Sequence, residues 1–199
     1  PNYRAHTVET TKLAISARTH LQEMATQMGV AFDYSECGIL HVYSDAKDLA
    51  HARKVTQLLA QGGLERVELS AEEVRAKEPA LQGNLVGGFW TASDSTGDIH
   101  KFTFGMAEAL RARGVRFMME TEITCVRALE DGLRVIDADG EVHGFDGAVV
   151  CAGVGARALA HQYGDRVNVY PVKGYSITVN LDDPISQTAA PTRSLLDDK

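Results

Sequence analysis

Apolar residues recur every three or four positions over the first third of the chain, which is the spacing of amphipathic helices. A long helix is predicted from Asn2 to Met28, with Gly29 at the position of a C-terminal cap. A second helix, opened by Ser44 or Asp45, is predicted to end at 62–63. The expected apolar face is Ala14, Ala17, Leu21, Met24 and Met28 in the first helix and Leu49, Ala52, Val55 and Leu59 in the second.

Two further helices are marked by side chains that can cap their first turns. Ser70 and Glu73 form a capping box, and the short helix that follows must end before Pro79. Asp98 can cap a longer helix that Gly114 closes. The expected apolar face of this longer helix is Ile99, Phe102, Met106 and Ala109.

Short apolar and β-branched runs between the helices predict strands. They lie at 39–43, 67–69, 85–90 and 115–119, and the run 195–199 begins another. Turn residues at 130–132 and 139–140 divide the next region into a three-stranded antiparallel meander, 123–129, 133–138 and 141–145. This mixture of helices and strands indicates an α+β or α/β protein.

The run Ala148–Cys151 is apolar without alternation, which predicts a strand buried on both faces of an α/β sheet, with Cys151 as a packing thiol. Ala152 and Gly153 end it, so another backbone or a ligand can approach there. The segment 153–158 also fits the G-x-G-x-x-A dinucleotide fingerprint, but the acidic residue expected about twenty positions later is absent. A tight strand-to-helix turn of any α/β protein is the other interpretation.

Composition narrows the possible partners of this chain. With 199 residues and 44% hydrophobic content it can form one large or two small cores. Its formal net charge of -7 and its lack of a long basic cluster argue against nucleic acid and anionic membranes as partners. Three unclustered cysteines indicate a reducing, cytoplasmic location. No metal-ligand spacing is present, so no metal is expected. The G-x-S-x-G motif of a nucleophilic serine is also absent.

Several of these features together resemble a known family. A strand closing on Ala152-Gly153, a short helix containing Arg157 and the strand Pro171-Val172-Lys173-Gly174-Tyr175-Ser176 are similar to the D-amino-acid oxidase-type flavoproteins, and among them to the D-amino-acid dehydrogenase small-subunit family. The order of elements before Ala80 resembles that family's substrate-domain insertion. The turn 94–98 resembles the point where its chain re-enters the flavin domain.

The resemblance implies part of an FAD-binding two-dinucleotide-binding-domain fold plus a mixed-sheet substrate-binding domain. Residues 1–94 would be the first part of the substrate-binding domain, 95–165 part of the FAD-binding domain, and 166–199 a return to the substrate-binding domain. The implied FAD-binding residues are Ile123, Ala152, Gly153 and Gly174, and the implied substrate-binding residues are Asp98, His100, Lys173 and Tyr175. No catalytic residue is assigned.

The activity implied by the resemblance is FAD-dependent oxidative deamination of D-amino acids to 2-oxo acids and ammonia, with electrons passing to the respiratory chain. The protein would then be cytoplasmic or peripheral on the inner face of the cytoplasmic membrane, and homo-oligomerisation stays open. Because the chain starts without methionine and stops within a strand, we expect a central fragment that holds FAD weakly or not at all. The alternatives are a non-redox module binding a small ligand, and a relative oxidising glycine, sarcosine or another secondary amine.

Overall fold

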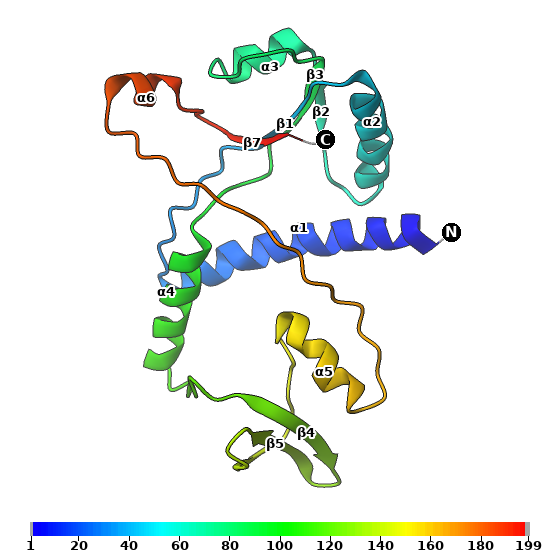
Figure 1. Cartoon of the computed structure of the whole chain (residues 1–199), viewed down its shortest axis with the longest axis vertical. Helices are drawn as coiled ribbons and strands as arrows, with labels where there is room; N and C mark the ends of the chain where they lie inside the picture. Colours follow the sequence, from blue (N-terminus) through cyan, green and yellow to red (C-terminus); the bar gives the residue numbers. More distant parts are fainter. Residues whose placement is uncertain (1, 198–199) are drawn as a thin grey trace. The chain divides into compact units, whose positions relative to one another are not determined.

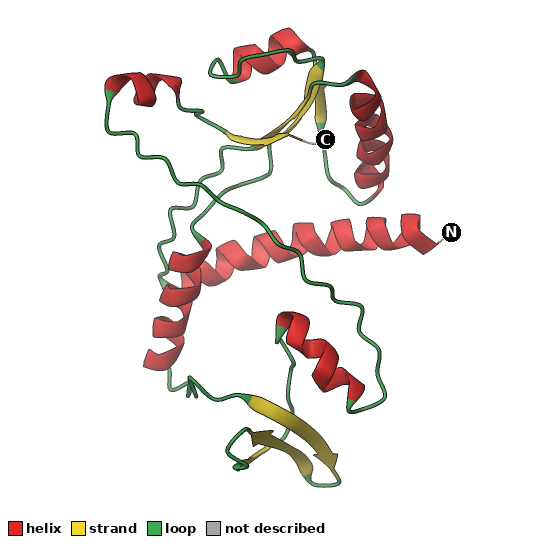
Figure 2. Ribbon diagram, in the orientation of Figure 1, coloured by secondary structure: helices red, strands yellow, loops and turns green. Residues whose placement is uncertain are grey.

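The computed structural model describes residues 2–197 (Figures 1 and 2). Contacts divide the chain into two compact units, and Arg116–Val179 form the second. The first consists of the described residues before Arg116 together with those from Asn180 onward. In order the elements are α1 (Asn2–Met28), β1 (Ile39–Tyr43), α2 (Ala46–Gln61), β2 (Val67–Leu69), α3 (Ala71–Lys77), β3 (Gly87–Thr91), α4 (Ile99–Ala112), β4 (Ile123–Leu129), β5 (Gly132–Asp137), β6 (Val142–Phe145), η1 (Gly153–Gly155), α5 (Ala156–His161), α6 (Pro184–Ala189) and β7 (Ser194–Asp197).

The first unit contains a four-stranded mixed sheet in the order β2-β3-β1-β7. β3 pairs antiparallel with both β1 and β2, while β1 and β7 run parallel and place Leu40 beside Leu195. β7 follows β1 by about 150 positions, so this sheet joins distant parts of the sequence. The predicted strands 39–43 and 67–69 match β1 and β2.

Both faces of this sheet are covered, because alternate residues of the strands pack against different helices. On one face Leu40 and Val42 pack with Val74 of α3. On the other face Tyr43 and Phe89 pack with α2. In Figure 1 α3 and α2 accordingly flank the strands on different sides.

The predicted helix caps of the first unit are present. Asp45 accepts a hydrogen bond from the Lys47 N–H, and Ser70 and Glu73 form the complete capping box of α3. Asp98 accepts from the Lys101 N–H at 3.0 Å. Local side-chain chemistry therefore places these helix starts where the sequence predicts them.

The predicted packing faces of α1 and α4 are partly wrong. In α1 the buried residues are Thr11 and Ala25, whereas Ala14 and Ala17 are exposed. The reason is close approach of α2: a Cβ added at Gly62 would lie only 2.6 Å from Thr11 Cβ, so a small residue is needed at that contact. In α4 Ile99 lies 69% exposed at the first turn, while the later apolar residues of the predicted face are half-buried.

The second unit is built on the predicted meander. β4 pairs antiparallel with β5, and β5 with β6. The turns fall at 130–131 and 138–141, next to the glycines that predict them. Val126 is the buried apolar residue of this sheet.

Three predicted strands are wrong in this structure. Residues 115–119, 148–151 and 170–176 form no strand, and Figure 2 draws the last two as loop. Val149 is 88% exposed and Cys151 is exposed instead of buried. A strand forms only where a neighbouring strand pairs with its N–H and C=O groups. No described strand lies beside these runs, so they form no sheet.

No helix in the described part of the chain combines the length and the apolar character needed to cross a membrane.

Candidate functional site

Gly153 occupies the turn that the sequence marks as a place of close approach. It opens η1, which leads directly into α5, and its φ of +53° lies in the left-handed region. A side chain would be strained there, so the backbone itself requires glycine. A Cβ built on Gly153 meets nothing within 4 Å. The main chain at this turn is therefore uncovered by any described residue.

Gly174 lies in the extended segment that follows the second unit's helix. Its φ is outside the left-handed region and a Cβ built on it meets nothing within 4 Å. Neither strain nor crowding among the described residues demands glycine at this position. Because Gly174 has no side chain, a ligand or another segment can approach the main chain here.

Ile123 begins β4 and belongs to the same unit as Gly153. The Gln162 Nε2 donates to the Thr124 carbonyl at 2.8 Å, which ties the end of α5 to the start of β4. A cavity of 650 Å³ lies beside this contact, lined by 125–129 with Gln162 and Tyr163. Neither Ile123 nor Gly153 lines it, so a groove shared by the two stays a prediction.

Lys173 and Tyr175 flank Gly174 and interact with each other. The Lys173 ammonium lies 5.4 Å from the centroid of the Tyr175 ring, a cation–π contact. Tyr175 is 88% exposed, so most of its surface is open despite the contact with Lys173. Both side chains are available to a small molecule approaching this segment.

Asp98 and His100 lie together at the start of α4, in the first unit. The Asp98 carboxylate accepts from the Lys101 N–H, and this hydrogen bond lowers its pKa below the ordinary value. The His100 ring stacks on Phe104 with centroids 6.4 Å apart. Asp98 thus has the capping role that the sequence predicts, and an active-site role for either residue stays a prediction.

Among the described residues Glu78 has the most buried carboxylate, and it is not among the candidate site residues predicted from the sequence. It is 1% exposed and accepts from the Ala80 N–H at 3.1 Å and from the Thr192 and Arg193 N–H groups at 2.7 and 3.0 Å. Burial alone would raise the pKa of Glu78, but these hydrogen bonds more than offset it, so the pKa lies below the ordinary value. Thr192 and Arg193 lie more than a hundred positions further along the chain, so no local pattern can indicate this pairing.

A second cluster that the sequence did not indicate lies in the β5–β6 hairpin. The ligand atoms of Asp137, Glu141 and His143 lie within 4.8 Å of one another. Asp137 Oδ1 accepts from the Asp139 and Glu141 N–H groups at 3.1 and 2.8 Å, and Oδ2 lies 3.0 Å from His143 Nε2. These contacts tie the Asp137 carboxylate to the turn and to β6, so the cluster stabilises the hairpin.

Comparison with known proteins shows to which protein family this chain belongs. The profile of the FAD dependent oxidoreductase family, DAO, matches residues 1–199. The chain therefore belongs to the DAO family of FAD dependent oxidoreductases. The family resemblance seen in the turn 152–153 and in the segment 171–176 is confirmed.

Curated relatives refine the assignment within this family. The chain is 47% identical over 199 residues to D-amino acid dehydrogenase 3 of Mesorhizobium japonicum, covering 99% of this chain and 48% of that protein. It is 36% identical to D-amino acid dehydrogenase of Paramagnetospirillum magneticum, covering 98% of this chain and 46% of that protein. The chain thus spans about half the length of these relatives.

The fold is shared with solved structures of the same class. Glycine oxidase from Bacillus cereus superposes with a TM-score of 0.64 at 18% identity, covering 79% of this chain and 43% of that chain. At this identity the likeness concerns the fold alone. It agrees with the predicted combination of part of an FAD-binding fold and a mixed-sheet domain.

Proposed function

We propose that this chain forms part of an FAD-dependent enzyme that oxidises D-amino acids to 2-oxo acids and ammonia. The observation that carries the proposal is the 47% identity to D-amino acid dehydrogenase 3 over 99% of the chain. FAD, when bound, supplies the acceptor for the hydride of the substrate Cα. The chain would bind and orient the substrate and the cofactor, with 1–94 and 166–199 as parts of the substrate-binding domain and 95–165 as part of the FAD-binding domain.

The residues proposed for FAD present uncovered main chain. Gly153 and Gly174 both leave open space where a side chain would stand, and Ala152 adds only a methyl group. Ile123 would contribute through its backbone at the start of β4. Such residues allow a planar ring system to lie against the polypeptide without steric conflict, which supports their assignment to a flavin.

The residues proposed for the substrate include a positive charge that complements the carboxylate of an amino acid. The Lys173 ammonium can attract the carboxylate of an amino acid, and its contact with the Tyr175 ring holds the two side chains together. His100 and Asp98 lie at the start of α4, where Asp98 fixes the first turn. Tyr175 would line the pocket with its ring.

A chimera tests the proposal. In D-amino acid dehydrogenase 3 of Mesorhizobium japonicum, the matched region is replaced by these 199 residues. The chimera is expected to retain flavin and to oxidise D-amino acids with an artificial electron acceptor. A panel of D-amino acids, their L-enantiomers, glycine and sarcosine separates the candidate substrates.

The outcomes discriminate among the three functions. D-amino acid turnover without glycine or sarcosine turnover supports the proposal. Preferred turnover of glycine or sarcosine would transfer the assignment to a same-fold amine oxidase. A folded chimera that binds D-amino acids but holds no flavin would favour a non-redox binding module.

We extend the proposal to the electron acceptor and to the isolated chain. Electrons would leave to the respiratory chain, from a cytoplasmic protein or one peripheral on the inner membrane face. The 199-residue chain by itself is expected to lose FAD on desalting, because the proposed cofactor residues offer main chain and a few small side chains. A flavin absorbance band that persists after desalting would contradict this.

A further inference from the structure

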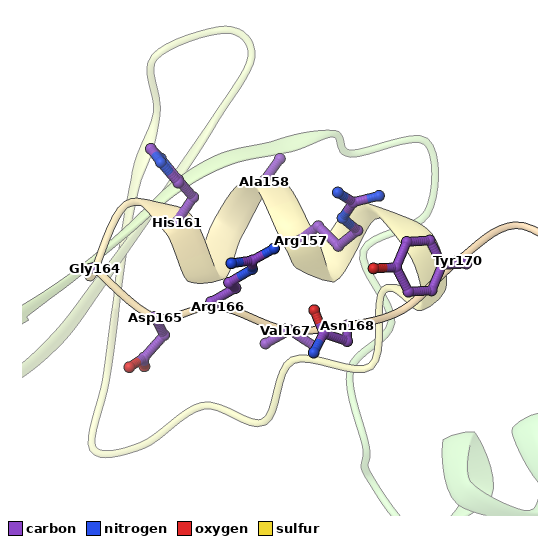
Figure 3. A pocket seen from close by; sticks show the side chains of 9 residues that line it. All are labelled: Arg157, Ala158, His161, Gly164, Asp165, Arg166, Val167, Asn168 and Tyr170. Atoms are coloured by element: carbon purple, nitrogen blue, oxygen red, sulfur yellow. The ribbon is translucent and has the colours of Figure 1, made fainter.

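A cavity of 570 Å³ lies between α5 and the segment that follows it (Figure 3). It is distinct from the residues proposed for flavin and substrate, and all of its lining belongs to the second unit. Its size is that of a small-molecule site. The lining residues that carry the argument are Arg157, Arg166, Asn168 and Tyr170.

Two arginine side chains line this cavity, and neither is paired with a carboxylate of the described residues. Neither Arg157 nor Arg166 forms an ion pair or hydrogen bond with another described residue. Asp165 is the acidic residue of the lining, and Figure 3 shows it pointing away from α5 while Arg166 points toward the helix. In a chain of net charge -7, such a local excess of positive charge stands out.

One of the two guanidinium groups, that of Arg157, is held by a neighbouring aromatic ring. Arg157 lies 5.3 Å from the centroid of the Tyr170 ring, a cation–π contact that restricts its orientation. Asn168 adds an amide, which can donate to an oxygen atom. A planar guanidinium can donate two parallel hydrogen bonds to one oxyanion.

From this placement we propose that the cavity binds a phosphate group. A tetrahedral dianion offers oxygen atoms in several directions, which suits a cavity lined by Arg157 on α5 and by Arg166 and Asn168 on the segment that follows. A single carboxylate has only two oxygen atoms in one plane and matches this arrangement less well. The inference goes beyond the proposed amino acid oxidation and does not depend on it.

Calorimetric titration of the purified chain with inorganic pyrophosphate, at low ionic strength, tests this site. The double variant Arg157→Gln/Arg166→Gln is expected to bind about tenfold or more weakly, because it loses charge-assisted hydrogen bonds from both arginines. The matched control is Arg116→Gln/Arg127→Gln. It removes the same charge from exposed positions of the same unit outside this cavity. The control is expected to change affinity by less than about threefold.

Circular dichroism establishes that both double variants fold. Should the glutamine variant not fold, Arg157→Lys/Arg166→Lys replaces it; this variant keeps the charge and loses the forked geometry, and weaker binding is again expected. No binding of pyrophosphate by the unaltered chain would overturn the proposal. So would equal weakening in the cavity variant and its control, which would indicate a general charge effect.

Three further titrations, with adenosine monophosphate, inorganic phosphate and acetate, identify the source of the phosphate. If adenosine monophosphate binds more tightly than inorganic phosphate, the site accepts a nucleotide whose base adds contacts. If the two bind equally, the site recognises the phosphate group itself. Acetate is expected to bind more weakly than either, and acetate binding as tight as phosphate would overturn the assignment to a phosphate group.

Discussion

The two units of the chain differ in the interactions that stabilise them. The first has a sheet covered on both faces, with Leu40 and Phe89 almost wholly buried. In the second, Val126 is buried in the meander, but Val172 and Ile177 are 90% exposed or more. Apolar burial therefore stabilises the first unit, whereas hydrogen bonds and short-range pairing define much of the second.

This difference bears directly on where a cofactor could act. The residues assigned to flavin lie in the second unit, and Gly153 and Gly174 leave their main chain uncovered. Apolar side chains beside them, such as Val172, are equally uncovered. The chain spans about half the length of its curated relatives.

The largest expected effect comes from paired truncations in the two units. Leu40→Ala is expected to destabilise the first unit by about 3 kcal/mol, because it leaves a cavity in a fully buried cluster. Ile177→Ala is expected to stay within about 0.5 kcal/mol, because that side chain is in solvent. The fluorescence of Trp90, the single tryptophan, measures urea unfolding of the first unit. Circular dichroism measures urea unfolding of the whole chain. Equal effects would contradict the comparison.

The next effect concerns the buried Glu78. Glu78→Gln is expected to cost the first unit about 2 kcal/mol, because one acceptor becomes a donor facing the Ala80 N–H. Glu72→Gln, on the exposed side of α3, is the matched control and should change stability by less than about 0.5 kcal/mol. The Trp90 fluorescence transition in urea measures both.

Acid should remove the contribution of Glu78 to the stability of the first unit. Folding lowers its pKa below the ordinary 4.5, so the unfolded chain takes up a proton first as the pH falls. The stabilisation is therefore present above pH 4.5 and is lost as the pH falls through the folded pKa. The difference between the unaltered chain and Glu78→Gln should shrink in that range, and a difference that grows on acidification would contradict this role.

A smaller effect is expected in the β5–β6 hairpin of the second unit. Asp137→Asn removes one acceptor oxygen and weakens the contact with His143, so the amides of Asp139 and Glu141 should exchange with solvent about fivefold faster. Asp131→Asn, at an exposed carboxylate, provides the control. Unchanged exchange in Asp137→Asn would show that backbone pairing alone maintains the hairpin.

Local signals in the sequence predict much of this structure. Asp45, Ser70 and Asp98 cap helices as expected, since a cap involves atoms only two or three residues apart. The meander is predicted for the same reason, because its turns are local. The family resemblance at 171–176 identifies the class of protein although the segment itself forms no strand.

Features that depend on distant partners could not be predicted. Val149 reads as a buried strand residue, but burial requires neighbouring strands, and the described residues supply none beside it. Glu78 meets Thr192 only through the three-dimensional fold. The uncovered main chain at Gly174 is visible in the structure alone, because a glycine in a sequence does not show what surrounds it.

The central claim is that uncovered main chain at Gly174 contacts the flavin. Measuring the FAD affinity of the chimera carrying Gly174→Ala, with Gly147→Ala as the control, tests it most directly. Both glycines have open space where a Cβ would stand and neither has a left-handed φ, so neither change should alter the stability of the 199-residue chain. The account predicts that Gly174→Ala weakens FAD binding by at least about tenfold, since the methyl group would occupy the space of the flavin. Gly147→Ala should leave binding unchanged. Full FAD affinity in Gly174→Ala would contradict the assignment of this segment to the cofactor.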